Sequence, residues 1–171
     1  MLKMVLTTAT CVGFALAGAT AALAQDMAAP QGDVLLTVTG DIEVTNVGET
    51  LQLDREQLAA LDMSSFDTTT IWSDGVHTFA GTSLAALVDF LDVTDGTILA
   101  TAINDYTVEI PVSDAVEGGP IIATLMDGEE MSVRDKGPLW IVYPYDSRNE
   151  YRSEVVYSRS IWQLDRIEVK R

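Results

Sequence analysis

The only cysteine of the chain, Cys11, lies within the first 24 of its 171 residues. All later residues must therefore fold without a disulfide, a thiolate metal ligand or a cysteine nucleophile. Their stability has to come from an apolar core. A domain of about 150 residues buries roughly 70% of the surface that its unfolded chain exposes, which is adequate for a core without cross-links. The sequence thus predicts one self-sufficient domain.

The first residues have the pattern of a secretory signal peptide. Lys3 precedes a charge-free run that ends in the small residues Ala22-Leu23-Ala24, and polar residues follow at once. This pattern favours a cleaved signal over a transmembrane anchor. We expect residues 1–24 to direct export to the periplasm, residues 25–32 to form a flexible leader and residues 33–171 to fold. We expect no stable membrane insertion of the mature chain.

Charge is distributed unevenly along a sequence whose formal net charge is −16. Residues 26–133 contain 20 acidic residues and a single basic one, whereas residues 134–171 contain eight basic and six acidic residues. Half of the twelve aromatic residues also lie in this last quarter. An acidic body repels phosphate backbones, so we expect no binding to nucleic acid. The last quarter either pairs with the acidic body and supplies aromatic core, or it builds most of a pocket that binds an anion or is lined by aromatic rings.

The apolar pattern predicts an α+β fold in which β structure dominates, with mixed sheets and a few short helices. Asp54 and Gln57 have the spacing of a capping box, which predicts a helix through about Leu61. A second helix is expected after Thr82 or Ser83. Strands are expected at 34–38, 42–47, 51–53, 66–73, 76–80, 97–103, 106–112, 121–126, 139–143 and 164–169. Asp74-Gly75 predicts a tight turn between the fourth and fifth of these.

The usual catalytic patterns are missing. His77 is the only histidine, which excludes sites built from several imidazoles. The sequence has neither a GxGxxG nor a P-loop signature, and too few strand–helix alternations for a doubly wound fold. Residues 81–85 only loosely match a nucleophile elbow.

Several short segments, taken in order, resemble the molybdopterin-binding domain of the sulfite oxidase family, in the small single-domain form that bacteria export. They are Trp72 through Phe79-Ala80-Gly81 to Leu87, Asn104-Asp105-Tyr106 with Ile110-Pro111, Ile122-Ala123 through Asp127-Gly128-Glu129, Gly137-Pro138-Leu139 with Tyr143-Pro144, and Trp162 to Ile167. The resemblance covers about residues 34–169. It implies the fold of that domain and molybdopterin as the cofactor.

The resemblance also implies a set of binding residues. The expected residues are Thr70, Trp72, Asn104, Tyr106, Arg134, Lys136, Tyr143, Tyr145 and Arg159. The three cations would meet a phosphate or a substrate oxyanion, and the aromatic rings would stack on the pterin or exclude water. A purely structural interpretation stands beside this one, with the tryptophans as core anchors and the arginines as salt-bridge partners.

The chain departs from the family where the family's chemistry is located. Thr68-Thr69-Thr70 stand where active members carry the cysteine that ligates molybdenum, and Trp140 replaces an arginine. A hydroxyl is harder and far less acidic than a thiol, so it does not substitute for that ligand. Two hypotheses remain, and whether the protein is an enzyme stays open. One is an exported oxidoreductase-like protein that binds molybdopterin without the standard cysteine-ligated chemistry. The other is a non-catalytic periplasmic module that senses a small anion or pterin, or binds a periplasmic or membrane protein.

Overall fold

The computed structural model of the protein describes residues 27–171. The predicted signal peptide, residues 1–24, lies outside the described residues, as does the start of the predicted leader. Residues 27–32 already contact the domain. The backbone N–H groups of Gln31 and Gly32 both donate to Oδ2 of Asp54 at 2.9 Å, and the carbonyl of Ala28 accepts from the amide of Gln57.

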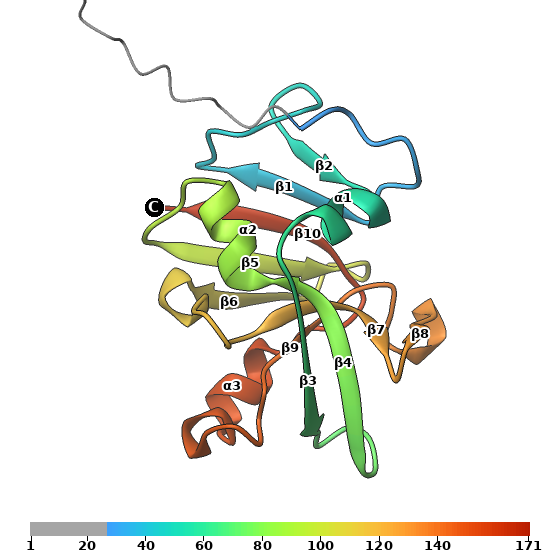
Figure 1. Ribbon diagram of the computed structural model, residues 1–171. Coiled ribbons are helices and arrows are strands. Elements are labelled where there is room, and N and C mark those ends of the chain that lie inside the picture. Colours follow the sequence, from blue (N-terminus) through green and yellow to red (C-terminus); the bar gives the residue numbers. More distant parts are fainter. Residues whose placement is uncertain (1–26) are drawn as a thin grey trace, which may run out of the picture.

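Two five-stranded sheets form the fold (Figure 1). The first sheet has the order β2 (Leu51–Leu53), β1 (Leu36–Gly40), β10 (Leu164–Lys170), β5 (Thr97–Ala102) and β6 (Thr107–Pro111). Only β1 and β10 are parallel in it, and the other neighbours are antiparallel. The first and last strands of the domain are therefore hydrogen-bonded to each other at the middle of one sheet.

The second sheet is antiparallel throughout. Its strands are β3 (Met63–Thr69), β4 (Val76–Ser83), β7 (Ile121–Met126), β8 (Glu129–Glu130) and β9 (Trp140–Val142), of which β9 pairs with β7. The long β3–β4 hairpin projects away from the first sheet (Figure 1). A register shift between Ala80 and Gly81 bends β4, and a Cβ at Gly81 would collide with the backbone of Ile122 and Ala123.

The helices are short. They are α1 (Arg55–Ala60), α2 (Leu84–Phe90) and α3 (Glu154–Arg159), with 3-10 turns at Val112–Asp114, Val133–Asp135 and Asn149–Tyr151. Side chains cap each α-helix at its N-terminus: Asp54 in a complete capping box, Ser83 and Ser153. Such caps satisfy backbone N–H groups that have no partner within the helix. Within residues 27–171, no helix has the length and apolar character needed to cross a bilayer.

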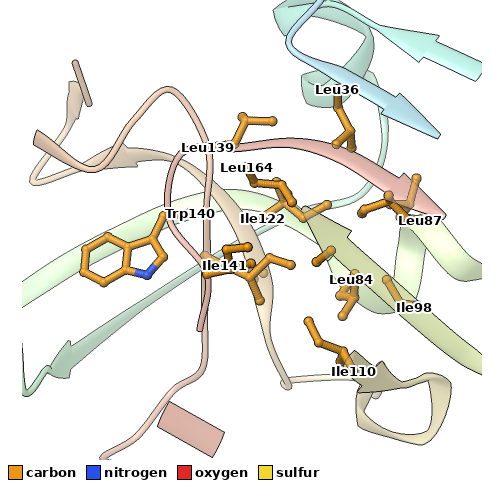
Figure 2. Close-up of a cluster of buried hydrophobic side chains, with 14 of the residues drawn as sticks. Leu36, Leu84, Leu87, Ile98, Ile110, Ile122, Leu139, Trp140, Ile141 and Leu164 are labelled. Atoms are coloured by element: carbon orange, nitrogen blue, oxygen red, sulfur yellow. The ribbon is translucent and has the colours of Figure 1, made fainter. Parts of the chain in front are cut away.

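One cluster of fully or almost fully buried aliphatic side chains joins both sheets and α2 (Figure 2). We call it the aliphatic core, and its members include Leu36, Leu84, Leu87, Ile98, Ile110, Ile122, Leu139, Ile141 and Leu164. Trp140 is equally buried, but its indole ring points away from these aliphatic side chains (Figure 2). It belongs to a different environment, described below.

The expectation of an α+β fold with β structure dominant is confirmed, and the two helices expected from the sequence are present as α1 and α2. The strand expected at residues 42–47 is wrong, because only an isolated bridge between Val47 and Thr50 forms there. Both the N–H and the carbonyl of Gln52 bond to the side chain of Asn46 instead. The expected hairpin is present, but its strands end at Thr69 and Val76, so its turn is longer than Asp74-Gly75. Helix α3 was not predicted.

Candidate functional site

Trp72, in the loop that connects β3 and β4, lies at the centre of a group of aromatic rings. Its ring centroid is 5.6 Å from that of Trp162, 5.8 Å from Trp140, 5.9 Å from Tyr157 and 6.2 Å from Tyr145. All four pairs are edge-to-face, an arrangement that aromatic quadrupoles favour over a face-to-face sandwich. We call these five residues the aromatic cluster.

Four segments bring the aromatic cluster together. Trp140 begins β9 and forms an isolated bridge with Trp162, which lies just before β10. Tyr145 follows β9, and Tyr157 is carried by α3. The cluster therefore depends on the packing of the last quarter of the chain against the β3–β4 loop.

Hydrogen bonds hold the β3–β4 loop in place. The backbone N–H of Trp72 donates to Oγ1 of Thr70, which lies 2.7 Å from Oγ of Ser73. Thr69, the last residue of β3 before the loop, donates both its backbone N–H and its hydroxyl to Asp146. These hydrogen bonds from Thr69, together with one from Arg152, hold the pKa of Asp146 below its usual value. Thr70, one of the expected binding residues, thus shapes the loop that carries Trp72.

A pocket of about 400 Å³ lies beside the aromatic cluster. Its lining residues carry no formal charge and come from the β3–β4 loop, the end of β5 and the β5–β6 connection, α3 and the segment before β10. They are Trp72, Ala102, Asn104, Tyr106, Tyr157, Ser158, Ser160, Ile161, Trp162 and Gln163. A concave, mainly apolar surface with a few polar groups is the usual character of a small-molecule site.

Three of the residues expected to bind a ligand line this pocket: Trp72, Asn104 and Tyr106. The side-chain oxygen Oδ1 of Asn104 accepts from the backbone N–H of Tyr106, which fixes the tight turn between β5 and β6. The side chain of Tyr106 is 58% exposed and stands at the rim. The backbone N–H of neighbouring Ile103 bonds to the carbonyl of Gln163, so this turn is tied to the segment before β10.

Tyr143 and Arg159 belong to a separate polar group. Oδ2 of Asp114 accepts from the hydroxyl of Tyr143 at 2.7 Å and from the guanidinium of Arg159 at 2.8 Å. Burial and the neighbouring carboxylate raise the pKa of Tyr143 far above its ordinary value. The ion pair with Asp114 compensates the positive charge of Arg159. Ser158 and Ser160, its neighbours in the chain, line the pocket, but Arg159 does not.

Tyr145 is fully buried in the aromatic cluster, and its hydroxyl donates to Oγ of Ser160 at 2.6 Å. Burial raises its pKa. Its hydroxyl therefore orients one pocket-lining serine, while its ring packs edge to face against Trp72.

The remaining two expected residues, Arg134 and Lys136, do not line the pocket. Arg134 lies on an exposed 3-10 turn. The ammonium of Lys136 lies 5.5 Å from the ring centroid of Trp140, within the range of a cation–π contact. The structure therefore does not gather the three expected cations, Arg134, Lys136 and Arg159, around one site.

Several pocket residues were not among the expected set: Ala102, Tyr157, Ser158, Ser160, Ile161, Trp162 and Gln163. The concentration of aromatic residues in residues 134–171 was the signal for Tyr157 and Trp162, which the sequence left open as core. No sequence signal marks the two serines, since α3 itself has little apolar periodicity.

The pocket does not suit the cofactor that the resemblance implies. Residues 27–171 contain no cysteine, and within them no group of three or more His, Cys, Asp or Glu side chains is placed to hold a metal ion. The pocket lining also lacks a cation to meet the phosphate of molybdopterin. We derive no chemical step through this cofactor.

No protein-family model matches the chain, and no curated protein matches it.

Proposed function

We propose that the protein is a non-catalytic module that binds a small organic molecule in the pocket beside Trp72. The observation that carries this proposal is the pocket itself, in which aromatic rings from four segments surround about 400 Å³ without a charged side chain. This volume lies within the usual range for small-molecule sites.

The polar groups around the pocket are available to a ligand. Within residues 27–171, no hydrogen bond uses the hydroxyls of Tyr106 and Tyr157, the indole N–H of Trp162 or the amide N–H₂ of Asn104. A few free hydrogen-bonding groups on an apolar surface can orient a ligand and discriminate between ligands.

The contacts of the pocket serines argue against catalysis. The hydroxyl of Ser158 donates to the carbonyl of Val155, and that of Ser160 to the carbonyl of Val156. A serine nucleophile needs a neighbouring general base. His77 is held on β4 by Asp127 and the carbonyl of Asp74, and it does not line the pocket.

A fragment screen by ligand-detected NMR, with a titration of each hit, tests this function. We expect hits that bind the wild-type protein and lose at least about tenfold in affinity in Trp162→Ala, because the aromatic rings of the lining supply much of the apolar contact area. Val76→Ala, at a 63% exposed position outside the pocket, is the matched control. An absence of hits, or hits that bind Trp162→Ala as well as wild type, would contradict the proposal.

A pterin is the second candidate ligand, as the sulfite oxidase resemblance implies. Trp72, Asn104 and Tyr106, which the resemblance singles out, all line the pocket. Protein purified from its native source, analysed for pterin and molybdenum, separates the two candidates. Stoichiometric molybdopterin would overturn the non-catalytic function, and its absence with fragment binding retained would support it.

We further propose that the protein acts in the periplasm, on the basis of Lys3, the charge-free run and Ala22-Leu23-Ala24. Cell fractionation with N-terminal sequencing tests this location. We expect a periplasmic protein that begins at Gln25. A cytoplasmic protein with an intact N-terminus would contradict the export hypothesis without affecting the pocket.

A further inference from the structure

We propose that the ligand of the pocket carries an alkylated ammonium group, such as trimethylammonium, which the aromatic rings bind by cation–π contacts. The inference rests on the proposed binding function and names the chemical class of its ligand. The small anion that the sequence left open as a ligand is thereby replaced by a cation.

The composition of the lining points to a cation. Four of the ten lining residues are aromatic (Trp72, Tyr106, Tyr157 and Trp162), and none of the ten is positively charged. The faces of aromatic rings carry a negative potential, and tryptophan presents the strongest one. An anion in this pocket would meet ring faces without a compensating cation.

The ring geometry suits a compact, rounded cation. The planes of Trp162 and Tyr157 are inclined at 72° and 85° to the plane of Trp72. Steeply inclined rings present faces in different directions, as the base and walls of a box do. A flat ligand would stack on one of them only, whereas a trimethylammonium group contacts several at once.

The aromatic cluster already holds one cation of the protein itself. The ammonium of Lys136 lies over Trp140 at 5.5 Å from its ring centroid, and Trp140 contacts both Trp72 and Trp162. Within residues 27–171 Lys136 forms no ion pair, so this group of rings lies next to a positive charge that no carboxylate compensates.

Long-range charge acts in the same direction. The net charge of −16 attracts cations and repels anions. Arg166 beside the β5–β6 turn pairs with Asp105, and Arg159 behind the pocket pairs with Asp114, so both positive charges are neutralised locally.

The lack of a carboxylate in the lining indicates which cations are favoured. A primary ammonium is strongly hydrated and needs a charged or hydrogen-bonding partner to replace that water. An alkylated ammonium holds its water weakly and gains contact with the rings. We therefore expect selectivity for alkylated over primary ammonium groups.

Calorimetric titration with choline and with 3,3-dimethylbutan-1-ol, its neutral isostere, tests the inference. We expect choline to bind about tenfold more tightly than the isostere, a preference that only the charge can produce. Ethanolamine, the primary amine, should bind more weakly than choline. Binding of the isostere with equal or higher affinity would overturn the inference while leaving the proposed binding function intact. Failure of both probes, and of every fragment, would contradict both proposals.

Variants distinguish a cation site from an anion site. Trp162→Ala and Tyr106→Ala should each weaken choline binding, and Tyr106, being 58% exposed, can be replaced with little risk to the fold. Lys136→Gln should leave choline affinity unchanged or raise it, because a repelling charge next to Trp140 is removed. A loss of choline binding in Lys136→Gln, or unchanged binding in Tyr106→Ala, would contradict the cation–π assignment.

Discussion

The aliphatic core and the aromatic cluster each bring together segments that are far apart in the sequence, and they are packed in different ways. Branched aliphatic side chains such as Leu84 and Ile122 are completely buried and fill the space between β4, β7 and α2. The rings of the aromatic cluster meet edge to face and leave about 400 Å³ open beside Trp72. The aliphatic side chains are close-packed between the strands, whereas the aromatic cluster packs tightly around Trp140 and Tyr145 but leaves a pocket beside Trp72.

The comparison extends to polar groups. Thr82, next to the aliphatic core, is fully buried and satisfies its hydroxyl on the carbonyl of Leu58. Beside the aromatic cluster, the hydroxyl of Tyr106 and the indole N–H of Trp162 take part in no hydrogen bond within residues 27–171. Folding satisfies the buried hydroxyl beside the aliphatic core, whereas the pocket beside the aromatic cluster retains hydrogen-bonding groups that a ligand can engage. The predictions below test this division.

Truncating the aliphatic core should have the largest effect on stability. Leu84→Ala removes a fully buried side chain at the start of α2 and leaves a cavity, so we expect a loss of about 2–5 kcal/mol in the free energy of unfolding. Urea denaturation measures it. Ligand affinity in the remaining folded protein should be unchanged, and a parallel loss of affinity would show that the two regions are not independent.

Truncating the aromatic cluster at Trp162 should affect ligand binding more than stability. Trp162 is 37% exposed, so Trp162→Ala should cost only about 1–2 kcal/mol of unfolding free energy while it weakens ligand binding. The same denaturation and titration experiments apply. A stability loss as large as that of Leu84→Ala would indicate that the cluster is ordinary core.

Tyr143→Phe tests the polar group behind the pocket. It removes the hydrogen bond to Asp114 but leaves the Arg159 ion pair, and we expect a loss of about 1 kcal/mol in unfolding free energy. Tyr106→Phe removes a hydroxyl that makes no hydrogen bond within residues 27–171, so this variant should stay within about 0.5 kcal/mol of wild type. Changed ligand affinity in Tyr143→Phe would place this group within the binding site.

Acid should produce the smallest effect that we predict. The His77 ring and the backbone N–H of Thr78 hydrogen-bond to Asp127 and lower its pKa in the folded protein. A lowered pKa gives stability that is fully present above the ordinary value of about 3.9 and is lost as the pH falls through the lowered value.

Thermal unfolding between pH 2.5 and 7 measures this effect. Asp127→Asn should lower the melting temperature at pH 7 and reduce the part of the acid-induced decrease that falls below about pH 4. Asp95→Asn, at an exposed carboxylate, is the control. Identical pH profiles for wild type and Asp127→Asn would show that the His77 pair contributes nothing.

Local patterns predicted the elements whose signals lie within a few residues. The capping box of Asp54 and Gln57 and the cap at Ser83 form as the sequence indicates, because each needs only its own helix turn. The strand expected at 42–47 fails because the side chain of Asn46 takes over hydrogen bonds that a strand would make. A β-branched run cannot reveal such competition from a neighbouring amide.

The candidate site was only partly predictable for a similar reason. An aromatic pocket involving the last quarter of the chain was one of two interpretations, and Trp72, Asn104 and Tyr106 were expected in it. No local sequence pattern indicated that the expected cations would lie outside the pocket. Arg159 pairs with Asp114, 45 residues earlier in the chain, and only the tertiary structure brings those charges together.

By itself, the sequence determined a cysteine-free α+β domain, its helix caps and most of its strands, because hydrophobic periodicity and capping act over short distances along the chain. The tertiary structure decided that the β3–β4 loop meets α3 and the segment before β10, and that the resulting pocket is aromatic and uncharged. Contacts between residues 72 and 162 depend on how two sheets pack, and no pattern within a short window of sequence contains that information.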